Sequence, residues 1–192
     1  MTSSRNSVTT QAARRALWLA ACLAIAVVVR ANGTDDRTQA AVAAAFPGAT
    51  ATEHKVGISS AVRAQLGEAA KAHLAPRWRW RYLAIDHPDH GRVGFGGTWK
   101  TVGRHGKIEM LVLTDVELTV VGVTILKHRE QHGKGIARAS FLDQFRAKKP
   151  GDRWKLGQDI DGISSATVSS RAVTSGVRNC LAYLRTFALS TP

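Results

Sequence analysis

The alternation of apolar and polar residues predicts a run of β-strands between residues 77 and 126. In Arg77–Ile85, basic residues alternate with aromatic ones, which is the two-residue period of a strand with one buried face. Leu118–Leu126 is apolar at nearly every position, which predicts a strand buried on both faces at the centre of a sheet. The other two predicted strands are Arg92–Val102 and Lys107–Val116.

Helical spacing dominates on either side of these strands. The last helix is predicted to begin near Ser169, and its apolar residues recur at a spacing of three to four to form one buried stripe: Val173, Val177, Cys180, Leu181 and Leu184. Shorter helices are predicted at Thr38–Phe46, at Val62–Leu74 after a Ser59 or Ser60 cap, and at Ala139–Arg146. Helices flanking consecutive strands predict an α+β fold with an antiparallel sheet, in one domain after an N-terminal apolar segment.

The N-terminal segment predicts export. Ala16–Val29 is an apolar run of 14 residues with Arg14 and Arg15 before it and Arg30 after it. This length is typical of a signal peptide and shorter than most membrane spans, but the flanking arginines also suit an uncleaved anchor. Both alternatives keep the N-terminus in the cytoplasm. The remainder is either anchored on the periplasmic or extracellular side of the cell membrane, or secreted to the periplasm after cleavage.

The same pattern predicts three parts: residues 1–31 as signal peptide or anchor, 32–76 as a helical N-terminal part of the exported region, and 77–192 as the main domain. With 27 basic and 14 acidic residues, the formal charge of +13 favours anionic partners. Nucleic acid is not an expected partner, because exported proteins seldom meet it. Since Cys22 lies in the apolar segment and Cys180 is the other cysteine, no disulfide, cysteine-ligated metal or haem attachment is expected in the main domain.

One acidic and histidine-rich stretch does not predict a metal site. Asp86, His87, Asp89 and His90 lie within five residues, but their spacing matches no standard metal site and Pro88 marks a turn. A solvated turn is the expected structure.

A hydroxyl-rich stretch precedes the last helix. Five of the seven residues 164–170 are serine or threonine, and Arg171 follows. The free N–H groups and positive dipole end of a helix N-terminus suit an anion, above all a phosphate. The alternative is that one of these hydroxyls only caps the helix.

The order of residues in this stretch resembles a known motif. Asp161-Gly162-Ile163-Ser164-Ser165-Ala166-Thr167 is similar to the flavinylation motif of the FMN-binding domain family, which includes one component of the Rnf electron-transport complex and one of the sodium-pumping NADH:quinone oxidoreductase. Val168–Val173 resembles the usual continuation. The stretches 122–130 and 141–145 are similar to a strand ending in a His-x-Glu element and to a recurrent helix, so that the resemblance covers residues 92–185.

The resemblance implies specific roles for these residues. Thr167 would carry FMN through a phosphoester that a flavin transferase forms from FAD, and Asp161 would be part of what that enzyme recognises. The residues that would surround the cofactor are Ser164, Ser165, Ala166, Ser169, Ser170, Arg171, His128 and Glu130. The sequence departs from the family where Gln131-His132 replaces a common Thr-Pro, which affects the expected contacts of that loop and not the acceptor threonine.

The functional prediction is an exported or membrane-anchored electron-transfer flavoprotein. The sequence contains no recognisable NAD-binding or iron–sulfur motif, so the expected electron donors and acceptors are redox partner proteins or quinone. A relay domain or subunit of an oxidoreductase complex is expected rather than a self-contained enzyme. The alternative is a non-redox exported binding module in which the Ser/Thr cluster only caps a helix.

Overall fold

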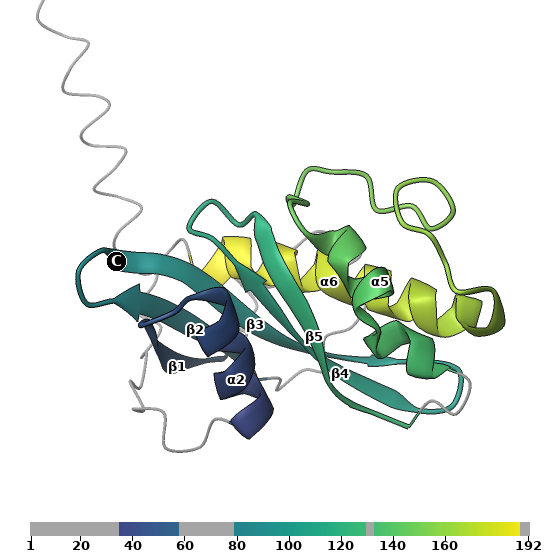
Figure 1. Ribbon diagram of the computed structural model, residues 1–192, viewed down its shortest axis with the longest axis horizontal. Coiled ribbons are helices and arrows are strands. Elements are labelled where there is room, and N and C mark those ends of the chain that lie inside the picture. The colour runs from purple at the N-terminus through teal and green to yellow at the C-terminus, as the bar shows by residue number, and fades with distance from the viewer. Residues whose placement is uncertain (1–34, 58–78, 130–132, 189–192) are drawn as a thin grey trace, which may run out of the picture.

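The computed structural model describes residues 35–57, 79–129 and 133–188, and these residues form an antiparallel sheet with helices on both faces (Figure 1). The five strands pair in sequence order: β1 (Thr50–Gly57), β2 (Arg79–His87), β3 (Gly91–Val102), β4 (Lys107–Thr114) and β5 (Val120–His128). The helices are α2 (Asp36–Ala45), α5 (Ala139–Leu142) and α6 (Thr167–Phe187), with single 3₁₀ turns η1 (Gly133–Ala137), η2 (Asp143–Phe145) and η3 (Ser164–Ala166). The predicted fold class is confirmed.

The long helix α6 covers one face of the sheet. The five residues of its predicted apolar stripe are all fully buried, and Tyr183 packs edge-on against Trp80 and Trp99 of the sheet. The helix approaches closely at Gly97, where an added Cβ would collide with the sulfur of Cys180. This packing fixes the position of α6, and with it the hydroxyl-rich stretch at its N-terminus.

The short helix α2 covers part of the opposite face. Val42 of α2 packs in a cluster with aliphatic side chains from β2, β4 and β5: Leu83, Ile85, Leu111, Leu113 and Leu126. At the start of the helix, the guanidinium of Arg37 donates a hydrogen bond to the carbonyl of Leu126 at 2.8 Å. Away from α2, this face carries polar side chains such as those of Arg81, Thr98 and Glu109. Helix α2 agrees with the helix predicted at Thr38–Phe46.

Two predictions about the strands need correction. No strand was predicted before residue 77, yet β1 pairs with β2 along its whole length. Only Val56 of β1 is buried, so this edge strand lacks the apolar alternation that identifies strands in a sequence. The strand predicted to be central, Leu118–Leu126, forms β5 at the opposite edge of the sheet.

The apolar character of β5 has a different cause from a central position. Helix α2 packs against it from one side and α5 with η2 from the other. The edge itself is partly paired, because Val120 exchanges backbone hydrogen bonds with Ala147 and Lys148. Burial on both faces therefore does not require a strand on both sides.

Several predicted features lie outside the described residues. These are the N-terminal apolar segment, the helix expected after Ser59 or Ser60, and Glu130. Within the residues that the structure describes, no helix is long and apolar enough to cross a membrane.

Candidate functional site

Three loops meet the N-terminus of α6 at one end of the sheet. Ser169, in the first turn of α6, accepts a hydrogen bond through its Oγ from the N–H of Arg104 at 3.3 Å, which ties the helix to the turn between β3 and β4. The 3₁₀ turn η1, which follows β5, packs against both η3 and α6. Close contact at Gly135, where an added Cβ would lie 3.1 Å from Ile163, brings this loop against the motif. The fold thus concentrates loops at the hydroxyl-rich stretch.

The five hydroxyl residues are divided into two groups by burial. Ser169 and Ser170 are fully buried. Ser170 Oγ accepts a hydrogen bond from the N–H of Ile163 at 3.2 Å, so it holds the preceding loop against the helix. Ser164, Ser165 and Thr167 are exposed. Only these three hydroxyls are therefore open to an enzyme or a ligand from solvent.

The predicted capping role of a serine is not seen. Helix α6 begins at Thr167, two residues before the predicted start at Ser169, and its N-cap is Ala166 with no side-chain cap hydrogen bond. Ser169 and Ser170 lie inside the helix and accept hydrogen bonds from N–H groups outside it. The first N–H groups of the helix have no hydrogen-bond acceptor within the helix. They are therefore available as donors beside Thr167, at the positive end of the helix dipole.

The loop before the motif is held by Gln144. Its side-chain oxygen accepts from the N–H of Asp161 at 2.7 Å, and its side-chain nitrogen donates to the carbonyl of Asp161 at 3.4 Å. The residue Asp161 is exposed. Sequence reasoning included Gln144 in a recurrent helix segment but gave it no role, because the two residues are 17 positions apart and only the fold brings them together.

A cavity of about 310 Å³ lies beside α6, one turn from Thr167. Arg171, Thr174 and Ser175 of the helix line it together with residues of the preceding loop: Trp154, Lys155 and Leu156. Residues four, seven and eight positions after Thr167 share its side of the helix. The lining includes two cations and no carboxylate, which suits an anionic ligand. The structure thus places Arg171 next to the predicted site.

The predicted His-x-Glu element is described only in part. His128 is half-buried at the end of β5, opposite Ile108 in the strand register. Its Nδ1 is buried and has no hydrogen-bond partner among the residues that the structure describes. Glu130 lies outside those residues. A contact between this element and the hydroxyl-rich stretch stays a prediction.

The acidic and histidine-rich stretch forms a turn, as expected. Asp86 pairs with Arg92 at 2.6 Å, and the N–H of Asp89 donates to Nδ1 of His87 at 3.2 Å. In the described parts of the chain, no three potential ligands come together to hold a metal ion.

These features define a class of protein: an α+β domain that presents one exposed threonine at the start of its long helix. Residues 103–182 match the model of the family described as FMN-binding domain. This part of the chain is therefore similar to that family, in agreement with the resemblance of the motif. This matched range begins in the β3–β4 turn and includes the whole motif.

Similar curated proteins are subunits of ion-translocating oxidoreductase complexes. The chain is 33% identical over 93 residues to the G subunit of the proton-translocating ferredoxin:NAD(+) oxidoreductase complex of Clostridium ljungdahlii, which is 44% of this chain and 50% of that protein. It is 33% identical over 90 residues to the G subunit of the Na(+)-translocating ferredoxin:NAD(+) oxidoreductase complex of Acetobacterium woodii, covering 42% and 43%. The chain spans about half the length of the curated relatives it matches.

The crystal structure of Shewanella oneidensis NqrC has a similar fold. It superposes with a TM-score of 0.55 at 15% identity, and the match covers 81% of this chain and 88% of that one. At this level of identity the likeness establishes the fold.

Proposed function

We propose that this protein is an electron-transfer flavoprotein that carries FMN covalently attached to Thr167. The observation that carries this proposal is the orientation of the hydroxyls in the motif. Thr167 is exposed at the first residue of α6, whereas Ser169 and Ser170 are buried and hold neighbouring backbone. A hydroxyl that another enzyme must modify has to be exposed. Serines that only support the turn do not need to be exposed.

The residues around Thr167 fit a phosphate ester. The N–H groups of the first turn of α6 would donate to its oxygens, as helix N-termini do for phosphate groups. Arg171 and Lys155 line the adjacent cavity and would offset its negative charge. Ser164 and Ser165 are exposed in η3 and would complete the turn. His128 and Glu130 belong to the proposed surroundings of the cofactor.

Attachment requires an external enzyme in this proposal. The hydroxyl oxygen of Thr167 would form a bond to the flavin-bearing phosphorus of FAD, AMP would leave, and the hydroxyl proton would pass to a base of the flavin transferase. Asp161, whose backbone is fixed by Gln144, would be part of the surface that the transferase recognises. Bound FMN supplies one- and two-electron chemistry, and a covalent tether prevents its loss outside the cytoplasm.

The proposed setting is a membrane complex. The curated relatives are named as subunits of ion-translocating oxidoreductase complexes, and residues 1–31 have the composition of a signal peptide or anchor. We propose that the domain at residues 77–192 relays electrons between redox partner proteins or quinone on the periplasmic or extracellular side of the membrane. The strand β1 adds to its sheet from the preceding part of the chain.

Intact mass spectrometry of the full chain tests the attachment. Co-expression with a flavin transferase is expected to add the mass of one FMN residue, and Thr167→Ala is expected to abolish the gain. Ser140→Ala is the control, because it removes an exposed serine hydroxyl in α5 that has no place in the proposed cofactor site. An unmodified wild-type mass beside a transferase that modifies a known substrate would contradict covalent attachment. Modification retained in Thr167→Ala would move the site to another residue.

A further inference from the structure

The part of the sheet that α2 leaves uncovered carries an excess of positive charge. The strand pairing places six exposed cations on this side: Lys55, Arg79, Arg81, Lys100, Lys107 and Lys127. Residues directly opposite one another on paired strands point to the same side of the sheet. Lys55 of β1 lies opposite Arg81 of β2. Glu109 of β4 lies between Lys100 of β3 and Lys127 of β5. We call this surface the open face.

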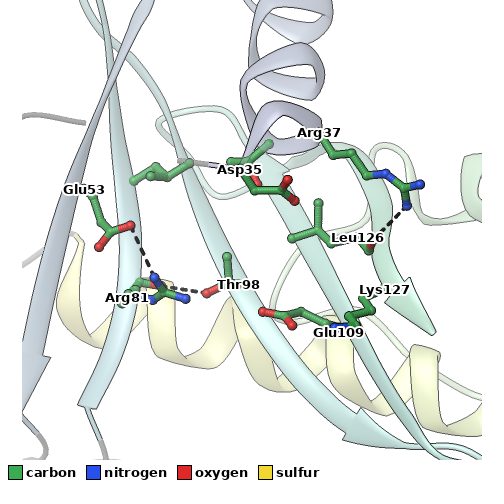
Figure 2. Close-up of a pocket in the computed structure, with 10 residues that line it drawn as sticks. Asp35, Arg37, Glu53, Arg81, Thr98, Glu109, Leu126 and Lys127 are labelled. Atoms are coloured by element: carbon green, nitrogen blue, oxygen red, sulfur yellow. Dashed lines mark hydrogen bonds and ion pairs between the residues drawn. The ribbon is translucent and has the colours of Figure 1, made fainter. Parts of the chain in front are cut away.

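The open face carries fewer acidic residues than basic ones, and its acids are Glu53, Glu109 and, at the start of α2, Asp35. Glu53 lies 3.7 Å from both Lys55 and Arg81, and Glu109 lies 3.3 Å from Lys100. Within the described residues, Arg79, Lys107 and Lys127 make no ion pair. The surface is hollowed by a groove of about 430 Å³ between the strands and the start of α2, and Figure 2 shows Arg81, Thr98, Glu109 and Lys127 along it with α6 on the far side of the sheet.

The start of α2 lies at the open face and follows closely in the sequence after the N-terminal apolar segment. Asp35 and Arg37, at the start of α2, line the groove. Arg30, which directly follows the apolar run, precedes Asp35 by five residues, and five residues span at most about 18 Å. If the apolar segment is in a membrane, the start of α2 therefore lies within this distance of the lipid surface, on the same side of the sheet as the cations.

We propose that the open face docks on a membrane surface rich in anionic lipid headgroups. This inference rests on the membrane-anchor part of the proposed function and not on the attachment of FMN. Phosphate oxygens of the headgroups would pair with the unpaired cations, and the short linker from the apolar segment would keep them close.

The helix α6 offers a charge-matched control. Its outward side carries Arg171, Arg178 and Arg185, all exposed, and the helix contains no acidic residue. It lies on the opposite side of the sheet from α2, so that the linker does not bring it to the membrane. Docking through general positive charge would involve α6 as well, whereas docking through the open face would not.

The experiment uses the full chain with Cys22→Ser, reconstituted into lipid nanodiscs. A bimane fluorophore on Thr98→Cys reports the open face, and one on Arg178→Cys reports α6. Cys180 is fully buried and stays unlabelled. The discs contain phosphatidylcholine alone or with phosphatidylglycerol, and a lipid with a nitroxide on its headgroup quenches any fluorophore at the surface. Retention of the protein on the discs in both lipid mixtures shows separately that the apolar segment is inserted.

Quenching at residue 98 is expected in discs with phosphatidylglycerol, and it is expected to fall in phosphatidylcholine alone and at high salt. The pair Lys107→Gln and Lys127→Gln should shift the docked equilibrium by about fivefold for each charge removed. Arg178→Gln with Arg185→Gln should leave it unchanged. Equal quenching in both lipids, or stronger quenching at residue 178, would overturn the proposal. So would an absence of quenching at residue 98 in discs with phosphatidylglycerol, since the open face would then not lie on the lipid surface.

Discussion

The side-chain amide of Gln144 holds the backbone of Asp161 at both its N–H and its carbonyl, at 2.7 and 3.4 Å. One residue thus fixes the first position of the motif from a different part of the chain. The carboxylate of Asp161 is left to solvent, where another protein can contact it. This relationship links the short helical segment around α5 to the site at the start of α6.

Replacing Gln144 with alanine is expected to slow modification of Thr167 more than it lowers stability. The two hydrogen bonds are exposed, so their loss should cost about 1 kcal/mol or less. The orientation of Asp161 would however become variable, and recognition by the transferase depends on it in our proposal. The measurement is the modified fraction by intact mass over time at limiting transferase.

Gln158→Ala is the matched control for this variant, because Gln158 is an exposed glutamine of the same loop. It should be modified at the wild-type rate. Equal rates for Gln144→Ala and wild type would show that the position of Asp161 is not what the transferase reads.

Ser170→Ala is expected to destabilise the fold, whereas Ser164→Ala is not. The change at Ser170 removes the acceptor of the Ile163 N–H in a part-buried position, which should cost about 1–2 kcal/mol. Ser164 is exposed, and its replacement should stay within about 0.5 kcal/mol. Denaturant unfolding with a shared slope measures both. A Ser170→Ala variant as stable as wild type would mean that this hydrogen bond contributes nothing to holding the loop.

The sequence predicted the elements that bury apolar residues and did not predict those defined by pairing. The apolar stripe from Val173 to Leu184 was sufficient to predict α6, because the side chains at this helical spacing are the ones that the helix buries against the sheet. Strand β1 was missed because this edge strand is held mainly by backbone hydrogen bonds, which do not require particular residue types. The position of β5 was wrong because helices on its two faces produce the same apolar run as a central strand.

The candidate site shows the same limit. The order of residues identified Thr167, but it could not tell which of the neighbouring hydroxyls point outward. Ser169 and Ser170 are buried and accept hydrogen bonds from Arg104 and Ile163, which lie outside the hydroxyl cluster. The role of Gln144 could not be predicted from the sequence, because its side chain bonds to the backbone of residue 161 and this bond does not depend on which side chain that residue carries.

Gly97→Ala is expected to destabilise the protein because α6 lies directly on this strand position. An added Cβ would collide with the buried sulfur of Cys180 and lie 3.0 Å from the ring of Trp80. Neither neighbour can move without shifting α6, so a cost of about 1–3 kcal/mol is expected. Gly122→Ala in β5 is the control, since its Cβ would meet nothing within 4 Å. Equal stability of the two variants would show that α6 can move away from the sheet.

Acid is expected to weaken the fold through His54. Burial lowers the pKa of His54 below its ordinary value of 6.5, and Arg92 lowers it further while Asp86 opposes the shift. The ring stacks on Tyr82 with 4.9 Å between centroids, which keeps it partly out of water. Below pH 6.5 the unfolded chain binds a proton at His54 more readily than the folded chain does. The free energy of unfolding should therefore fall as the pH falls, until the pH is below the pKa of His54 in the folded protein.

The test compares the pH dependence of unfolding in wild type and in His54→Gln, which cannot titrate at this position. Denaturant unfolding at neutral and mildly acidic pH should show a smaller loss of stability in the variant, because the other titrating groups are common to both proteins. His90→Gln, at an exposed turn residue, should retain the wild-type dependence. If His54→Gln lost as much stability as wild type on acidification, the acid sensitivity would have to come from another group, and the stacked position of His54 would have no consequence for the titration of the fold.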